Sequence, residues 1–175
     1  MSESLGGRLL VATPLLFDPN FWRTVVLVVD HDDNGAIGLV LNRPTAERVE
    51  THIPSWGALA TDPGTVHFGG PVEPQVAIGL ASGLSGEPTS VPGVCMVDLE
   101  SAPSGERGSV RIYSGYSGWG SGQLEIEVSE GSWYVVPAAP DDPFDRPEGQ
   151  WSRVLRRQGG HLALVATFPD DVEMN

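Results

Sequence analysis

The sequence predicts an α+β fold built from one domain. Three features support this prediction: short stretches in which bulky and small residues alternate, a hairpin signal at Asn34-Gly35, and helix signals that interrupt the strands without a regular strand–helix repeat. The chain has 175 residues, and single domains usually occupy about 100 to 200 residues. We therefore expect one domain over residues 1–175.

The strand signals begin near the N-terminus with Leu9 to Ala12. Residues 25–29 form an unbroken β-branched and leucine run, which is typical of a central strand. The dipeptide Asn34-Gly35 tolerates two positive φ angles and predicts a type I′ turn. We therefore predict an antiparallel hairpin over residues 24–41. Similar patterns predict further strands at residues 76–81, 94–99, 110–113 and 132–136.

The helix signals are shorter. Residues 18–22 open with Asp before Pro, which predicts one helical turn. Residues 46–52 predict a short helix that ends before a proline. The clearest start is Asp145, because Glu148 three residues later completes a capping-box pattern and apolar residues follow on one face. This helix is predicted to end at Gly159.

The charge of the chain argues against nucleic acid as a partner. Ten basic residues stand against 23 acidic ones, which gives a formal net charge of −13 and a pI near 4.5. The only basic cluster is Arg153, Arg156 and Arg157. It could contact phosphates, or it could complement the macrodipole at the end of the predicted helix. We favour the second interpretation and predict no specific binding of duplex DNA.

The N-terminal segment from Met1 to Gly7 has neither a basic region nor the apolar stretch of a secretory signal. The longest apolar runs span five or six residues, whereas a membrane helix needs about 20. We therefore expect a cytoplasmic protein with no membrane association. The single cysteine, Cys95, lies in an apolar run and is expected to be a small buried residue without a disulfide.

No metal site or cofactor is predicted. Residues 30–35 resemble the opening of a calcium loop, but Leu41 occupies the position where a bidentate Glu is needed. A hairpin turn with solvated acidic side chains explains the same residues, and metal binding by His31 is the remaining alternative.

No catalytic residue is predicted either. Around Ser117, the pattern of a nucleophile elbow fails because Trp119 stands where the motif requires glycine. His67 could act as a general base, but we favour a histidine at a strand end that makes structural hydrogen bonds. A hydrolase that uses His67 or Ser117 is therefore the third-ranked hypothesis.

Ordered blocks along nearly the whole chain resemble the AlgH/YqgE family of bacterial proteins. These blocks are Leu10 to Pro14, Asp18 to Phe21, Arg23 to Asp30, Asn34 to Pro44, Phe68 to Val72, Gly115 to Trp119, Gly122 to Glu125, and Trp133 to Pro137. The resemblance implies a bifurcated sheet rolled into a pseudo-barrel, and it implies no established biochemical activity. A label of transcriptional regulator accompanies the family, derived from an alginate-regulation phenotype that does not bear on DNA contact.

The resemblance also bears on two segments. Residues 123–128 alternate as in a strand, yet Leu124 and Val128 have helical spacing, and by resemblance we predict a helix over residues 122–130. In residues 98–108, where such proteins often carry a helix, the chain contains Ser-Ala-Pro-Ser-Gly. We expect that helix to be shortened or lost.

A binding module for a ligand or a protein is the first-ranked function, ahead of a regulator that acts directly or indirectly. Three family-like loops are predicted to converge on one cleft for a small anionic ligand or a peptide. The candidate residues are Asn42, Arg43, Pro44, Phe68, Gly69, Gly70, Pro71, Gly115, Tyr116 and Trp119. Arg43 offers a forked donor for carboxylate or phosphate, the glycines permit close approach, and Trp119 offers a stacking face. The alternative is that the glycines form tight turns and the aromatic residues pack in the core.

Overall fold

A computed structural model describes residues 3–169, so Met1 and Ser2 of the N-terminal segment discussed above lie outside it. The strands are β1 (Arg8–Ala12), β2 (Val25–Asp32), β3 (Gly35–Val40), β4 (Pro44–Arg48), β5 (Thr65–Phe68), β6 (Val72–Ser82), β7 (Glu87–Pro88), β8 (Cys95–Val97), β9 (Ser109–Gly120) and β10 (Trp133–Pro137). The α-helices are α1 (Val49–His52), α2 (Gln123–Ser129), α3 (Gln150–Gln158) and α4 (Gly160–Val165), and two 3-10 helices cover Pro54–Leu59 and Asp142–Phe144.

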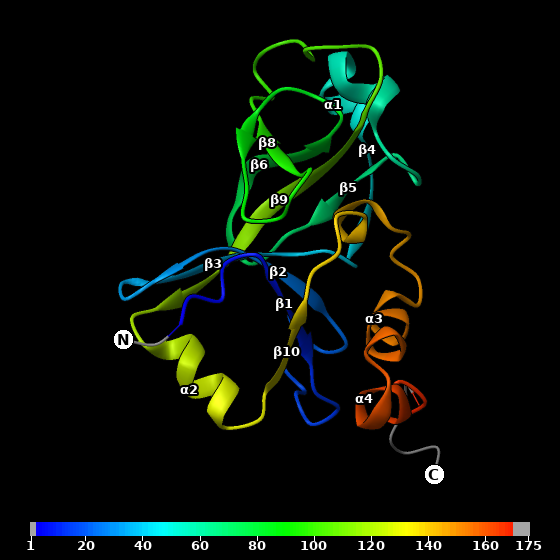
Figure 1. Ribbon diagram of the computed structural model, residues 1–175. Coiled ribbons are helices and arrows are strands. Elements are labelled where there is room, and N and C mark those ends of the chain that lie inside the picture. The colour runs from blue at the N-terminus through cyan, green and yellow to red at the C-terminus, as the bar shows by residue number, and fades with distance from the viewer. Residues whose placement is uncertain (1–2, 170–175) are drawn as a thin grey trace.

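The long strand β9 belongs to two sheets, which makes the sheet bifurcated. The strand order is β10-β1-β2-β3-β9-β6-β8-β7, with β5 beside β9 and β4 beside β5. The second half of β9 pairs with β3, and its first half pairs with β6. All pairings between named strands are antiparallel except that of β5 with β9. Figure 1 shows the two sheets diverging from β9 into a curled half-barrel, which confirms the predicted α+β class.

The β2–β3 hairpin is confirmed, but its predicted turn is wrong. Asp32 pairs with Gly35, so the turn residues are Asp33 and Asn34, one position earlier than predicted. Gly35 has φ +138°, whereas Asn34 does not have the positive φ that a type I′ turn requires. The glycine serves a different purpose, because a Cβ at position 35 would lie 2.2 Å from the carbonyl oxygen of Trp119 on β9.

Residues 115–119 form a strand, not the predicted loop. The strand predicted to end at Tyr113 continues to Gly120, and its pairing with β6 shifts register between Val72 and Ala77. Gly115 has φ +69°, and a Cβ there would lie 2.6 Å from the carbonyl oxygen of Gly70. Glycine is required here by the close approach of two chain segments within the sheet.

The predicted helices are found near their predicted positions, but their lengths differ from the predictions. Helix α2 confirms the helix predicted for residues 122–130. Helix α3 begins at Gln150, so Asp145 does not cap it; the Asp145 carboxylate instead binds Arg153. Helix α1 is shorter than predicted because Pro44–Arg48 pairs with β5 as a strand. Residues 98–108 contain turns and bends and no helix.

Residues 18–22 form hydrogen-bonded turns in which the Asp18 carboxylate accepts from the backbone N–H of Asn20 at 2.8 Å. The capping role of Asp18 is therefore confirmed, although the segment is too short to count as a helix. On β8, Cys95 is half-buried rather than fully buried, and its thiol donates to the carbonyl oxygen of Leu84 at 3.3 Å.

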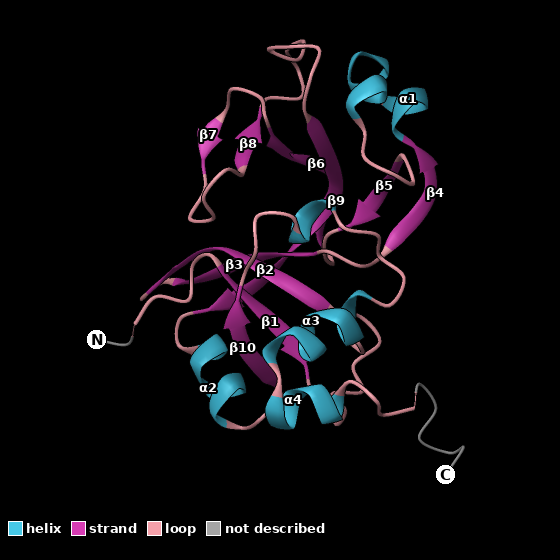
Figure 2. Ribbon diagram, turned by 45° about the vertical axis from the view of Figure 1, so that its right-hand side comes forward, coloured by secondary structure: helices cyan, strands magenta, loops and turns pink. Residues whose placement is uncertain are grey.

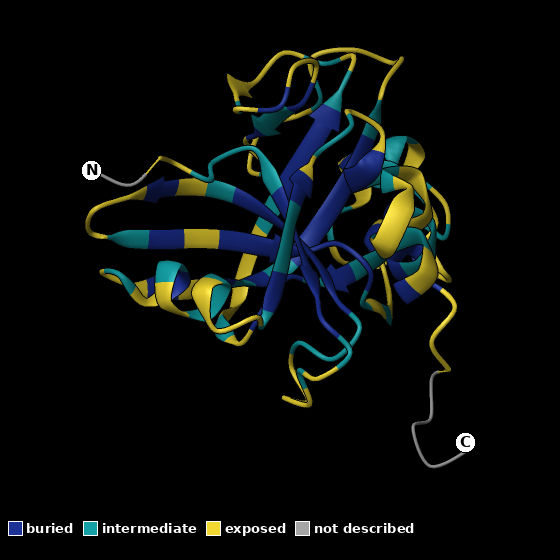
Figure 3. Cartoon of the chain, turned by 60° about the horizontal axis from the view of Figure 1, so that its bottom comes forward, coloured by how far each residue is buried: buried dark blue, intermediate teal, exposed yellow. Residues whose placement is uncertain are grey.

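The sheet of β10, β1, β2 and β3 has a buried cluster on each face. Because successive side chains of a strand point to opposite faces, Leu9 packs in the cluster that contains Trp151 of α3, and Leu10 packs in the cluster that contains Leu124 of α2. In Figure 1, β1 and β10 accordingly run between α2 on one side and α3 and α4 on the other, and Figure 2 shows the same helices from another direction. Buried strands meet at the centre of the molecule and exposed residues cover its loops and outer helix faces (Figure 3).

Candidate functional site

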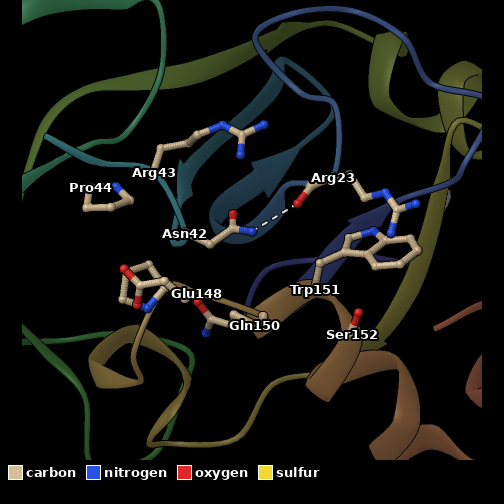
Figure 4. A pocket seen from close by; sticks show the side chains of 10 residues that line it. Arg23, Asn42, Arg43, Pro44, Glu148, Gln150, Trp151 and Ser152 are labelled. Atoms are coloured by element: carbon tan, nitrogen blue, oxygen red, sulfur yellow. Dashed lines mark hydrogen bonds between the residues drawn. The ribbon is translucent and has the colours of Figure 1, made fainter. Parts of the chain in front are cut away.

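A pocket of about 350 Å³ lies where the turn before β2, the segment between β3 and β4, and the start of α3 meet (Figure 4). We call it the Arg43 pocket. Its lining residues are Arg23, Asn42, Arg43, Pro44, Pro147, Glu148, Gly149, Gln150, Trp151 and Ser152. Three of the predicted site residues, Asn42, Arg43 and Pro44, are among them.

Arg43 is the half-buried cation of this pocket. One of its terminal nitrogens donates to the carbonyl oxygen of Trp22, which fixes the guanidinium at the pocket wall. Burial lowers the pKa of Arg43, because the charged form loses part of its hydration. No carboxylate within residues 3–169 forms an ion pair with it. The guanidinium therefore retains donors for an anion.

Asn42 supports the pocket and is itself almost fully buried. Its amide nitrogen donates to the carbonyl oxygen of Arg23 at 2.9 Å, and its amide oxygen accepts from the backbone N–H of Val25 at 3.0 Å. These bonds hold Arg23 in a left-handed conformation with φ +58°, which is uncommon for a residue with a side chain. The side chain of Asn42 thus fixes the turn to which Arg43 is bonded.

A second guanidinium, that of Arg23, lies over the indole ring of Trp151 at 4.0 Å from the ring centroid. It also donates to the carbonyl oxygen of Phe168 at 3.1 Å. The indole N–H of Trp151 donates to the carbonyl oxygen of Ala12 at 2.8 Å, which anchors α3 to the sheet. One side of the pocket is therefore a cation stacked on a fixed aromatic ring.

The predicted residues 68–71, at the end of β5 and in the connection to β6, do not line this pocket, and three of them lie against the backbone of other segments. The N–H of Phe68 donates to the carbonyl oxygen of Arg43 at 2.7 Å, and the carbonyl oxygen of Gly69 accepts from the N–H of Val40 at 2.9 Å. At Gly70, a Cβ would lie 2.1 Å from the carbonyl carbon of Tyr116. Residues 42–44, 68–70 and 115–117 are thus neighbours. Pro71, beside Gly70, is exposed and lines none of the described pockets.

The aromatic candidates line other hollows. Tyr116 faces a groove of about 670 Å³ between the two sheets, and Trp119 borders a hollow of about 200 Å³ beside the β2–β3 turn. The indole of Trp119 is 6% exposed, donates to the Glu127 carboxylate at 3.1 Å, and contacts Trp133 edge-on. The expected single cleft is therefore divided, and Trp119 does not share a pocket with Arg43.

The two residues of the hydrolase hypothesis are fully buried. Ser117 donates to the carbonyl oxygen of Gly69 at 3.2 Å. His67 accepts at Nε2 from the guanidinium of Arg111 at 2.8 Å and donates from Nδ1 to the carbonyl oxygen of Thr65 at 3.2 Å. Each side chain is thus engaged in a separate structural contact. Burial and the nearby Arg111 charge lower the pKa of His67 to about 4.

This low pKa predicts a pH-dependent stability. Between pH 6.5 and about 4, the unfolded chain binds a proton at His67 that the folded chain excludes, so stability falls as the pH falls through this range. We expect a loss on the order of 3 kcal/mol in the free energy of unfolding. Urea unfolding at several pH values measures it. The loss of unfolding free energy between pH 6.5 and about 4 should be much smaller in His67→Gln. It should be unchanged in His161→Gln, which alters an exposed histidine. An equal dependence of the unfolding free energy on pH in all three proteins would refute the role of His67.

The basic cluster on α3 is largely paired within the protein. Arg153 binds Asp145 at 3.0 Å, and Arg157 binds Asp142 at 2.8 and 2.9 Å. Arg156 and Arg157 are both exposed, and Arg156 is the one member of the cluster that forms no ion pair within residues 3–169. Arg156 and Arg157 lie in the last turn of α3, as the macrodipole interpretation expects, whereas Arg153 lies before that turn and binds Asp145. The two ion pairs reduce the positive charge that the cluster offers to phosphates.

No group of metal-ligating side chains occurs within residues 3–169. The imidazole of His31 accepts from the N–H of Leu5 at 2.8 Å and contacts the Glu125 carboxylate at 2.6 Å, so it joins the N-terminal segment to α2. In the same described range, none of the helices has both the length and the apolar content to cross a membrane.

The family profile described as AlgH-like matches residues 9–163. The chain belongs to the AlgH-like family. A UPF0301 protein of Streptomyces coelicolor is 50% identical over an alignment that covers 99% of this chain and 96% of the relative. A UPF0301 protein of Mycobacterium tuberculosis is 41% identical, with coverages of 97% and 90%.

Two solved structures share the AlgH-like fold. A crystal structure of a Corynebacterium diphtheriae protein superposes with a TM-score of 0.86 at 29% identity, covering 95% of this chain and 94% of that one. The solution structure of AlgH from Pseudomonas aeruginosa gives a TM-score of 0.68 at 30% identity, with coverages of 97% and 98%.

Sequence reasoning missed the opposite wall of the Arg43 pocket in this AlgH-like protein. Residues 147–152 lie about a hundred positions after Arg43, and their local pattern resembles an ordinary helix start. Arg23 was also missed, because its left-handed backbone depends on hydrogen bonds from Asn42. The only local hint was the position of Arg23 between two aromatic residues, Phe21 and Trp22, and a strongly apolar strand.

Proposed function

We propose that this AlgH-like protein is a binding module for a small organic or inorganic anion, held in the Arg43 pocket. The observation that carries the proposal is the half-buried guanidinium of Arg43, which lines the pocket without a carboxylate partner among residues 3–169. A cation that has lost hydration and lacks a counter-charge gains from an anion that takes its remaining donors. Carboxylate and phosphate groups match its planar fork.

The size and composition of the pocket support a small ligand. Its volume of about 350 Å³ is at the lower end of small-molecule sites, which span roughly 300–1,000 Å³. Glu148 also lines the pocket and adds a carboxylate that favours ligands bearing a donor as well as an anion. Regulation by direct DNA contact has less support because two of the three clustered arginines are paired. Hydrolysis has less support because His67 and Ser117 are buried.

The test is a thermal-shift and calorimetric screen with phosphate, malonate, citrate and adenosine monophosphate as probes. An anion that binds the native protein should raise its melting temperature, since a ligand at 100 times its Kd stabilises by about 2.7 kcal/mol. Arg43→Ala should weaken that binding at least tenfold. Arg43→Lys, which keeps the charge but loses the fork, should restore only part of the affinity.

The matched control is Arg156→Ala, which removes one exposed positive charge outside the pocket. It should leave the affinity unchanged, so any general effect of net charge becomes visible. If no probe binds, or if Arg43→Ala and Arg156→Ala weaken binding equally, the Arg43 pocket is not an anion site.

A further inference from the structure

The divergence of the two sheets from β9 creates a second concave surface, distinct from the Arg43 pocket. We call this groove of about 670 Å³ the inter-sheet groove. One wall comes from β2 and β3, the opposite wall comes from β6, β7 and β8, and Tyr116 of β9 lines it where the two sheets meet. The lining residues are Val29, Asp30, Ile37, Ile78, Glu87, Pro88, Thr89, Ser90, Met96 and Tyr116. None of them is an arginine, and the chain has no lysine.

The apolar side chains that line the groove are partly exposed to water. Ile37 is 42% exposed although it lies in a central strand of the sheet. Val29, Ile78 and Met96 are half-buried, so the two walls leave apolar side chains in partial contact with water. Covering such a surface is favourable by about 25 cal/mol for each Å² removed from water.

The charged part of the groove has one sign. Asp30 stands on the β2 wall and Glu87 on the β7 wall, and neither forms an ion pair within residues 3–169. Near Tyr116, the Glu73 carboxylate accepts from the phenol at 3.2 Å. Glu73 has φ +46°, a left-handed conformation that is uncommon outside glycine. Carboxylates on both walls make the groove complementary to a cation.

The edge strand beside the groove argues against an added peptide strand. Strand β7 contains only Glu87 and Pro88, and proline has no N–H to donate to a neighbouring backbone. A ligand must therefore be recognised by side chains rather than by extension of the sheet. The volume of the groove falls within the range of small-molecule sites.

We propose that the inter-sheet groove binds a small organic cation with an apolar body, such as a protonated primary amine. Its apolar part covers Ile37, Ile78 and Met96, and its cationic group lies between Asp30 and Glu87. The aromatic face of Tyr116 can add a cation–π contact. This site is independent of the Arg43 pocket, because the two pockets share no lining residue and attract opposite charges.

The test uses three probes with the same apolar body: 4-phenylbutylamine, 4-phenylbutanol and 4-phenylbutyrate. Calorimetry and two-dimensional NMR of the full chain should show that the amine binds at least fivefold more tightly than the alcohol. Amide shifts should cluster at β2, β3, β7 and β8. The affinity for the amine should fall as salt is raised, since at least part of the attraction is between exposed charges. Any binding of the acid should depend on Arg43 and not on the groove.

The double variant Asp30→Asn, Glu87→Gln should lower the affinity for the amine to that of the alcohol, while the melting temperature stays near that of the native protein. Glu106→Gln, which removes one exposed charge from the loop before β9, is the matched control and should bind like the native protein. The proposal is overturned if the amine does not bind, if it binds no better than the alcohol, or if the double variant and the control behave alike.

Discussion

Replacing Arg111 by methionine is expected to cost about 3–5 kcal/mol of the free energy of unfolding. The Arg111 side chain is 1% exposed and donates to the carbonyl oxygens of Asp62, Phe144 and Asp145 as well as to His67 Nε2. When both partners of a buried ion pair are replaced by apolar residues, little stability is lost, because no polar group is left without a partner. Here most partners are backbone carbonyls that remain in place and lose their donors.

Urea unfolding of Arg111→Met at pH 7 measures this loss directly. Arg111→Lys keeps the charge but reaches fewer acceptors, so its stability should lie between those of the methionine variant and the native protein. Arg156→Met changes an exposed arginine on α3 and should stay within about 0.5 kcal/mol of the native protein. A loss below about 1 kcal/mol for Arg111→Met would show that the buried guanidinium is not a structural anchor.

Gly70→Ala is expected to destabilise the protein by at least about 3 kcal/mol or to prevent its folding. Gly70 has φ +157°, and an added Cβ would lie 2.1 Å from the carbonyl carbon of Tyr116 and 2.3 Å from the N of Ser117. These atoms belong to the backbone of β9, which cannot move without breaking its hydrogen bonds to β3. Both the conformation and the space at position 70 therefore exclude a side chain.

Gly131→Ala separates the effect of backbone conformation from the effect of limited space. Gly131 follows α2 with φ +84°, but nothing lies within 4 Å of an added Cβ. Its replacement should cost only the conformational penalty of a left-handed residue, about 1–2 kcal/mol. Chemical denaturation and the yield of soluble protein compare the two variants, and equal losses would mean that the contact with β9 is unimportant.

The sequence allowed the strands with clear alternation to be predicted, because alternate residues of 36–41 pack on opposite faces of the sheet: Leu39 and Leu41 lie in one cluster, and Ala36 and Val40 in the other. The second half of β9 could not be predicted in this way. Gly115, Gly118 and Gly120 suggest a loop, whereas Gly115 is present because the segment after β5 passes too close for a side chain. That requirement is visible only once distant segments are placed together.

The Arg43 pocket shows the same limit. Arg43 could be proposed as an anion donor from its chemistry alone, and that role remains a prediction. The stacking of Arg23 on Trp151 depends on the docking of α3 against β1, which joins positions 139 residues apart. No local pattern encodes such a contact, so sequence reasoning found one wall of the pocket and not the other.

The sharing of β9 between two sheets has a consequence for how the protein opens. If β6 separates from β9, the first half of β9 keeps only its short parallel pairing with β5; if β3 separates, the second half loses its ladder. Because both halves are one continuous segment, fraying that begins in either sheet removes support from the other. Amide protons at the middle of β9 should therefore exchange with deuterium only in the rare global unfolding event. The two sheets then have a common lifetime, and the relative orientation of the groove walls is kept for as long as the chain is folded.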